Sequence, residues 1–300
     1  MLFFSPHLHL SFSMKKLWTL CAALLSVVSV ASAQSTMSCC TKPAAGQAAT
    51  EVFAMLASNE DFSGGHDAPL PFTYAGEGSM IEFKTTDGQT GKAFEIKSKT
   101  KSDKYLFVIH EWWGLNDYIK QEAGRFAEEL PGVNVIALDL YDGQIATDAD
   151  QAGKLMQGVK TERAQAIING ALAYAGPNAK IGSIGWCFGG GWSIQTALLA
   201  GPKAKACVAY YGMPEKDVAK LKTLNTDVLF VFAKQDKWIN QEVVDQFRKD
   251  MAAAKKGLTV KTYDADHAFA NPSNPKYSKD FAADAHAASV AYLKKNLKVK

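Results

Sequence analysis

Residues 181–191 read IGSIGWCFGGG, and this stretch decides the fold. An apolar, strand-like segment runs into a glycine-rich turn that carries Cys187, and a helix-like segment follows from Trp192 to Leu199. The turn matches the G-x-S-x-G nucleophile elbow, with cysteine in the place of serine. Such a turn needs glycine two residues before and after the nucleophile, because side chains there would collide with the neighbouring strand and helix. The helix N-terminus behind Cys187 would stabilise a thiolate and then an oxyanion.

The same glycines would also suit a plain tight connection or a phosphate-binding loop. However, the Lys-Ser/Thr pair of a P-loop is missing, and the glycines do not fit the G-x-G-x-x-G pattern. We therefore interpret the turn as a nucleophile elbow, and we expect the acid and the base of such a site elsewhere in the chain.

Apolar runs alternate with helix-like stretches on both sides of this turn. Strands are expected at 80–83, 93–96, 105–109, 133–138, 181–184, 206–210, 228–232 and 258–263, and helices at 117–130, 148–175, 192–199, 238–251 and 280–296. The first two strands, separated by Asp87-Gly88, form a predicted hairpin. Repeated strand–helix–strand units with apolar strands predict an α/β fold, with a mainly parallel central sheet and helices on both faces.

Composition excludes several classes of protein. The chain has 300 residues, 47% of them hydrophobic and 21% charged, so collagen-like, coiled-coil and disordered proteins are excluded. Its 33 Lys and Arg against 30 Asp and Glu show no basic cluster, and no nucleic-acid partner is expected. Five cysteines are too few and too unevenly spaced for a disulfide scaffold. We expect a monomer without metal or cofactor.

The N-terminus has the pattern of a secretory signal peptide over residues 1–33. Met14 precedes two lysines, an apolar run covers 17–30, and Ala31-Ser32-Ala33 has the form of a cleavage site. A retained membrane anchor is the alternative, but the run is shorter than the ~20 residues that cross a bilayer. We therefore expect an exported, periplasmic or secreted protein that is not membrane-bound when mature, with Met14 as an alternative start.

Behind the signal, residues 34–76 are expected to form an arm or linker and residues 77–300 a single domain. Cys39 and Cys40 lie in this arm, where pairing with other thiols, metal binding and plain exposure all stay open. Cys207 lies in an apolar, strand-like run and is expected to act as a small buried hydrophobe.

Chain order supplies partners for Cys187. Asp236 follows the expected strand 228–232, and His267 follows the strand 258–263. In elbow enzymes the acid and the base come after the nucleophile, each just past a later strand. Taken alone, Asp236 could be a helix N-cap and His267 a surface histidine. Together with the thiol, in this order and at the carboxyl ends of strands, they predict a catalytic triad.

Four motifs carry a resemblance to a known family. They are HEWWGLN at 110–116, DLY at 139–141, GWCFGG at 185–190, and the loops that hold Asp236 and His267. The chain resembles the dienelactone hydrolases, cysteine-dependent enzymes of the α/β-hydrolase fold, over approximately residues 78–297. The resemblance implies that Glu111 holds the resting thiol and helps to deprotonate it when substrate enters. An ion pair of Glu111 with Lys104 or Arg125 is the structural alternative.

The expected reaction is hydrolysis of an ester or lactone through a cysteine acyl-enzyme. The backbone N–H groups of Phe188 and Trp112 would bind the oxyanion. Trp113 and Trp186 would line the substrate pocket together with Asn271. This asparagine stands where the family pattern H-x-F-x-R has an arginine that helps to hold the substrate's carboxylate, so less anionic substrates are expected.

Two other functions stay open. A non-catalytic protein of the same fold could hold a small ligand in the pocket without turning it over. A redox role for Cys187 is the third reading, although no C-x-x-C is present. The other histidines considered, His66, His110 and His286, have no placement comparable to that of His267.

Overall fold

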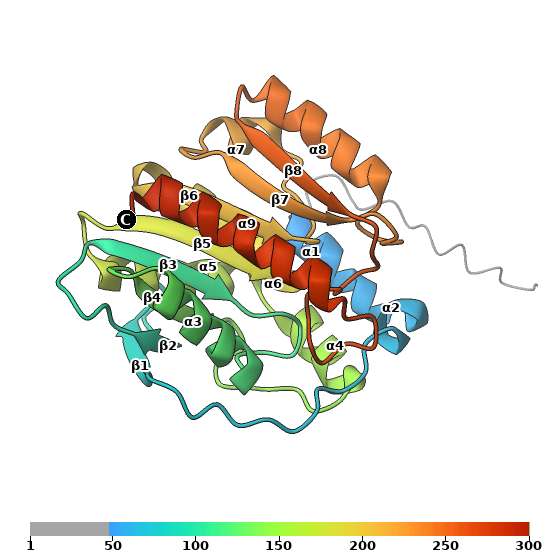
Figure 1. Ribbon diagram of the computed structural model, residues 1–300, viewed down its shortest axis with the longest axis horizontal. Helices are drawn as coiled ribbons and strands as arrows, with labels where there is room; N and C mark the ends of the chain where they lie inside the picture. The colour runs from blue at the N-terminus through green and yellow to red at the C-terminus, as the bar shows by residue number, and fades with distance from the viewer. Residues whose placement is uncertain (1–47, 300) are drawn as a thin grey trace, which may run out of the picture. The chain divides into compact units, whose positions relative to one another are not determined.

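The computed structural model describes residues 48–299, and an eight-stranded sheet organises them (Figure 1). The strands are β1 (Ser79–Lys84), β2 (Thr90–Ile96), β3 (Lys104–Ile109), β4 (Asn134–Asp139), β5 (Lys180–Trp186), β6 (Ala204–Tyr210), β7 (Val228–Ala233) and β8 (Leu258–Tyr263). Their order across the sheet is β1-β2-β4-β3-β5-β6-β7-β8. The expected signal peptide and the pair Cys39 and Cys40 lie outside the described residues.

The sheet is mainly parallel, as the sequence predicts. Only the pairs β1–β2 and β2–β4 are antiparallel among the described strands, and β1 and β2 form the expected hairpin. Every residue of β4 and of β7 is buried, because helices cover both faces of a parallel sheet.

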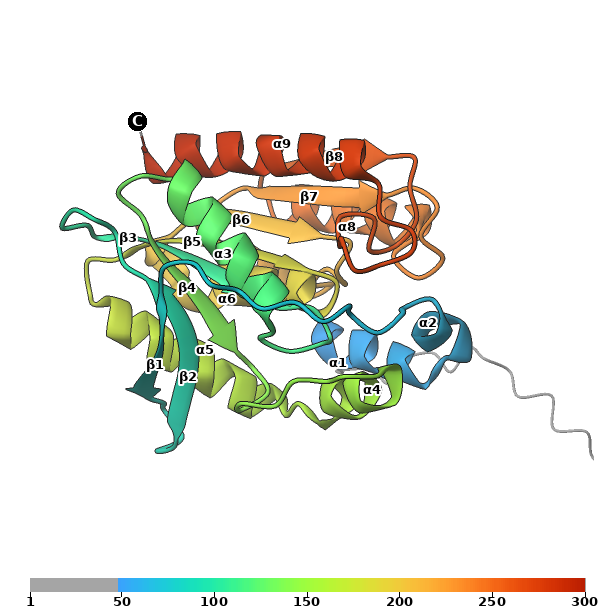
Figure 2. The same ribbon diagram turned by 60° about the horizontal axis from the view of Figure 1, so that its bottom comes forward.

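Helices pack on both faces of the sheet. They are α1 (Ala49–Ala54), η1 (Met55–Ser58), α2 (Glu60–Gly64), α3 (Asp117–Glu129), α4 (Ala149–Gly158), α5 (Thr161–Ala175), α6 (Phe188–Ala200), η2 (Gly201–Lys203), α7 (Val218–Lys222), α8 (Gln241–Ala253) and α9 (Lys279–Leu297). Helices α3 and α9 cover one face, and α5 and α6 the other (Figure 2). Within the described residues, no helix is both long and apolar enough to span a membrane.

The prediction of one helix over 148–175 is wrong in one respect, because the structure has two helices there. Helix α4 ends at Gly158, Val159 is extended with ψ 118°, and α5 begins at Thr161. Helix α5 packs against the sheet and α6, whereas α4 packs against α1, η1 and α2. Gly158 carries a local signal of this break, since glycine is common where helices end.

Residues 48–66 form a helical segment within the region that was expected to be an arm. Helices α1 and α2, joined by η1, lie beside the carboxyl ends of the central strands (Figure 2). Phe53 and Phe62 are fully buried in the hydrophobic core. We call residues 48–66 the cap segment, because its aromatic side chains pack over His267.

Candidate active site

Cys187 occupies the sharp turn between β5 and α6. Its backbone has φ 56° and ψ −119°, a conformation that costs a non-glycine residue about 1–3 kcal/mol. A Cβ on Gly185 would lie 2.1 Å from the carbonyl oxygen of Gly189. A Cβ on Gly189 would lie 2.3 Å from the carbonyl oxygen of Ile109. The glycines on either side of Cys187 are therefore required by close backbone contacts, as the elbow pattern predicts.

His267 and Asp236 form a buried hydrogen-bonded pair after β8 and β7. Nδ1 of His267 lies 2.6 Å from Oδ2 of Asp236. The other carboxylate oxygen accepts the backbone N–H groups of Trp238 and Ile239, at 2.9 and 3.0 Å. Helix α8 begins later and has Asn240 as its N-cap. Asp236 therefore orients the imidazole and accepts hydrogen bonds from its own loop. The alternative hypothesis, that Asp236 is the N-cap of a helix, is wrong.

The thiol lies next to this imidazole. Sγ of Cys187 and a ring nitrogen of His267 are within 4.8 Å of each other. Although burial opposes it, the Asp236 carboxylate raises the pKa of His267 well above its ordinary value. Burial raises the pKa of the Cys187 thiol, although His267 and the Phe188 N–H act in the opposite direction. The resting group is therefore a thiol that needs a base before it can attack.

Glu111 lies close enough to His267 and Cys187 to interact electrostatically with both. Burial raises the pKa of Glu111 to about 7, although His267 and a hydrogen bond from Asn271 act to lower it. The amide Nδ2 of Asn271 donates to Oε2 of Glu111. A carboxyl group that titrates near neutral pH can accept a thiol proton.

The ion pairs offered as an alternative for Glu111 are not formed. Lys104 donates to the carbonyl oxygen of Lys298 at 2.6 Å. Arg125 pairs with Glu122 at 2.7 Å. Glu111 instead contacts Asn271, the residue that stands where the family pattern H-x-F-x-R has its arginine.

His110 fixes the loop that carries Glu111, a role that the sequence did not indicate. Its Nδ1 donates to the carbonyl oxygen of Glu111 at 2.6 Å, and its Nε2 accepts the Leu140 N–H at 3.2 Å. Burial lowers the pKa of His110 to about 4, so the ring is neutral and Nε2 can accept. These two bonds tie the loop after β3 to the end of β4.

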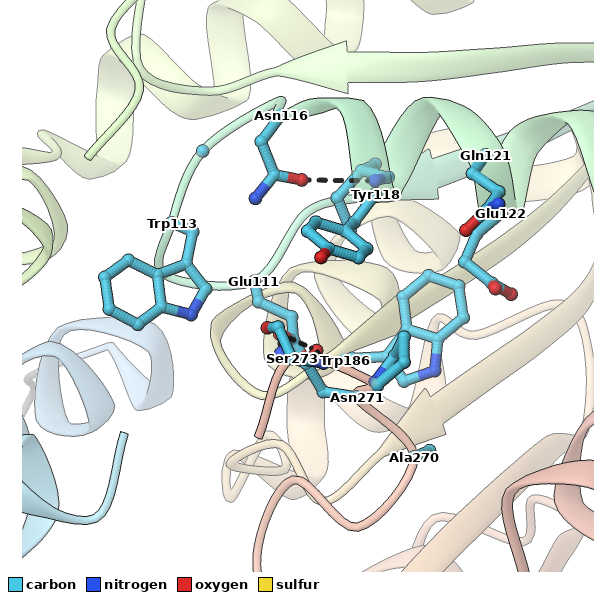
Figure 3. Close-up of a pocket in the computed structure, with 13 residues that line it drawn as sticks. Glu111, Trp113, Asn116, Tyr118, Gln121, Glu122, Trp186, Ala270, Asn271 and Ser273 are labelled. Atoms are coloured by element: carbon cyan, nitrogen blue, oxygen red, sulfur yellow. Dashed lines mark hydrogen bonds between the residues drawn. The ribbon is translucent and has the colours of Figure 1, made fainter. Parts of the chain in front are cut away.

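A pocket opens beside Glu111. Figure 3 shows Glu111 against Asn271, with Trp113 on one side and Trp186 on the other. The pocket encloses about 40 Å³, room for a few water molecules at most. The structure thus places all three expected pocket residues in one lining. A small-molecule substrate needs several hundred Å³, so side chains must move before one can bind.

The cap segment covers the thiol from the other side. The rings of Phe53, Phe62 and His66 lie 6.3, 5.7 and 5.5 Å from the His267 ring, measured between centroids. Cys187 is only 1% exposed. The site is therefore closed in this conformation, although its thiol and imidazole are neighbours.

His66 is the residue of this site that the sequence did not indicate. It is 6% exposed, and its ring packs against that of Trp112 at 4.7 Å between centroids, tilted by 58°. Burial, reinforced by the nearby His267, lowers the pKa of His66 to about 3. The sequence gives no signal that His66 lies beside Cys187, because the two residues are more than a hundred positions apart in the chain.

The two expected oxyanion donors come from different segments, the start of α6 and the loop after β3. Phe188 is the first residue of α6, where helix N–H groups have no partner within the helix, and its N–H faces the sulfur. Trp112 follows Glu111 directly, and its side chain is fully buried. Trp192, one turn into α6, is buried as well and belongs to the core.

Comparison with known proteins identifies the family of the chain. Residues 92–297 match the sequence profile of the dienelactone hydrolase family. The chain is 29% identical over 238 residues to Protein usf of Aquifex pyrophilus, with 73% of this chain and 99% of that protein covered. It is 27% identical over 233 residues to the carboxymethylenebutenolidase of Pseudomonas putida, with 71% and 94% covered.

A solved structure confirms the predicted α/β-hydrolase fold. It comes from Klebsiella pneumoniae and bears the name dienelactone hydrolase. Its TM-score is 0.61 at 24% sequence identity, with 72% of this chain and 99% of that chain covered. The likeness concerns the fold.

Proposed function

Because the chain belongs to the dienelactone hydrolase family, we propose that it hydrolyses an ester or lactone of a small molecule through a thioester on Cys187. Family membership supports a hydrolase. The observation that carries the finer proposal is the alignment of Cys187, His267 and Asp236 at the carboxyl ends of β5, β8 and β7, with the thiol within 4.8 Å of the imidazole.

In the proposed reaction the thiol proton passes to the carboxylate of Glu111. The sulfur then attacks the carbonyl carbon, and the N–H groups of Phe188 and Trp112 bind the oxyanion. As the carbon–oxygen bond breaks, the leaving alkoxide takes a proton from His267. The neutral imidazole next takes a proton from water, whose oxygen attacks the thioester. The released sulfur regains the proton held by Glu111.

Kinetics with p-nitrophenyl acetate test this proposal. We expect turnover that iodoacetamide abolishes, and a Cys187→Ala variant without activity. A Cys207→Ala variant is the matched control, since that thiol is buried in β6 and hydrogen-bonds within the core. A protein that binds esters without turnover would instead support the non-catalytic function. Turnover that survives alkylation of Cys187 would refute the thioester.

We further propose that the preferred substrates are uncharged. Among the residues that line the pocket, two are glutamates and none is lysine or arginine. Asn271 can offer an amide but not the charged fork that holds a carboxylate. Side-by-side assays should give a higher kcat/KM for small neutral esters than for dienelactone. Equal or better turnover of dienelactone would overturn this proposal.

A further inference from the structure

Three metal-binding side chains meet at the buried end of the active site. One ring nitrogen each of His66 and His267, and Sγ of Cys187, all lie within 4.8 Å of one another. All three residues are buried. Among residues 48–299, these three form the one group of histidine, cysteine or acidic residues whose ligand atoms are close enough together to hold a metal ion. The cluster exists because the cap segment brings His66 over the elbow.

Hydrogen bonds orient both imidazoles in the same way. Nδ1 of His66 lies 2.6 Å from the carbonyl oxygen of Phe62, and Nδ1 of His267 lies 2.6 Å from Asp236. Each Nδ1 thus donates its proton to a fixed oxygen, which leaves Nε2 to act as a ligand. Within the described part of the chain, neither buried Nε2 has a hydrogen-bond partner. A buried ring nitrogen without a partner costs free energy, whether or not it carries a proton.

Metal-binding histidines in proteins show this same outer arrangement. Their second ring nitrogen usually donates to a carboxylate or to a backbone carbonyl, and here one histidine has each partner. Two imidazoles and a thiolate are the ligands that zinc prefers. We propose that His66, Cys187 and His267 bind a Zn²⁺ ion. The sequence alone predicted no metal at this site.

The geometry requires only a small contraction. Zinc–nitrogen bonds of about 2.0–2.1 Å and a zinc–sulfur bond of about 2.3 Å place the three ligand atoms about 3.3–3.6 Å apart around a tetrahedral ion. Because no two of the ligand atoms are more than 4.8 Å apart, each pair must approach by at most about 1.5 Å to reach that arrangement. A water molecule would take the fourth position.

Metal binding and hydrolysis would exclude each other. On binding, zinc replaces the thiol proton and any proton on Nε2 of His267, and those protons pass to the buffer. The sulfur and the imidazole nitrogen then both coordinate the metal, so neither is free for catalysis. Zinc undergoes no redox change. This inhibitory consequence rests on the proposed function, whereas the binding site itself does not.

Cobalt substitution tests the site without any activity measurement. The full chain would carry Cys21→Ser, Cys39→Ser and Cys40→Ser, so that Cys187 and Cys207 remain as its thiols. The reduced protein, freed of metal by chelation, is titrated with Co²⁺ and then with competing Zn²⁺. We expect one equivalent of Co²⁺ to give a thiolate-to-cobalt charge-transfer band that one equivalent of Zn²⁺ removes.

Variants assign the ligands. His66→Phe keeps an aromatic ring among the neighbouring rings but has no ligand nitrogen, and it should weaken Co²⁺ binding at least tenfold. His66→Ala serves as a second variant should the phenylalanine form fail to fold. His286→Ala and Cys207→Ser are matched controls outside the site and should bind Co²⁺ as the parent does. An equal Co²⁺ affinity of the parent and a folded His66 variant overturns the proposal.

The two proposals can fail separately. A hydrolytically active, alkylation-sensitive protein that gives no cobalt band refutes the metal site alone. An inactive protein with a band that depends on Cys187 and His66 refutes the proposed hydrolysis alone. If both hold, Zn²⁺ should inhibit ester turnover, and EDTA should reverse the inhibition. A Cys187→Ser variant that keeps the band also refutes the metal site.

Discussion

Replacing Glu111 with glutamine should stabilise the fold while it slows the reaction. Burial gives the carboxyl group a pKa of about 7 in place of 4.5, so ionising it in the folded protein costs about 3 kcal/mol. The folded protein holds this proton to a higher pH than the unfolded chain does. The contribution of this carboxyl group to the free energy of unfolding therefore falls as pH rises from about 4.5 to about 7, and it stays low above pH 7.

Glutamine carries no charge and avoids this loss. It can still meet Asn271, because rotation of the new amide presents an oxygen to that donor. At pH 8 we expect the Glu111→Gln variant to unfold with a free energy about 3 kcal/mol higher than that of the wild type, and near pH 4.5 the two should be equal. Without a base for the thiol, kcat/KM at pH 8 should fall about 100-fold or more.

Denaturant unfolding at several pH values, together with ester kinetics, measures both effects. The difference between variant and wild type isolates Glu111, since the other groups titrate in both proteins. Glu122→Gln is a matched control, because this second pocket carboxylate pairs with Arg125 and should show no gain in stability at high pH. A Glu111→Gln protein that is less stable than the wild type at pH 8 and keeps full turnover would refute the reasoning.

Three further changes probe the elbow, the triad and the cap segment. Gly189→Ala should abolish activity and lower Tm, because its Cβ would lie 2.3 Å from a backbone carbonyl oxygen of β3; a fully active variant would contradict the turn geometry. Asp236→Asn should lower kcat on the order of 10⁴-fold by removing the carboxylate that orients His267, and pH–rate profiles should show a lower pKa for the imidazole. Phe62→Ala should speed iodoacetamide alkylation of the active-site thiol, measured by mass spectrometry, and an unchanged rate would show that the cap segment does not limit access. N-terminal sequencing of exported protein should begin at Gln34, and an intact first residue would argue against the signal peptide.

The features that the sequence predicted well are those with a local signal. The elbow around Cys187 needs glycines at fixed offsets, and the contacts of Gly185 and Gly189 show why. Asp236 and His267 each follow an apolar strand, and parallel strands bring their carboxyl ends to the same edge of the sheet. Short-range pattern and the topology of a parallel sheet were therefore enough to bring these side chains together.

The features that the sequence could not predict depend on contacts between distant segments. His66 reaches the thiol only because apolar residues of the cap segment, such as Phe53, pack into the core. The stretch before them is rich in small polar residues, which is typical of a linker. Likewise, Asn271 was expected to weaken a substrate clamp, but its bond to Glu111 could not be read from either loop alone.

The thiol is buried, so side chains around it must move before a substrate can reach the sulfur, and the cap segment is the part of the cover that we expect to move. The pocket holds about 40 Å³ and does not include Cys187 in its lining, so an ester cannot reach the sulfur as the side chains stand. Among the described residues, side-chain hydrogen bonds between the cap segment and the rest of the domain run from Thr161 to Glu51, from Gln157 to Ser58 and from Asn274 to Gly65. By contrast, a continuous ladder of backbone hydrogen bonds holds the strands that carry the triad. Opening should therefore occur at the cap segment. Because closure buries the thiol and Glu111 together, it raises the pKa of both groups and so opposes their ionisation.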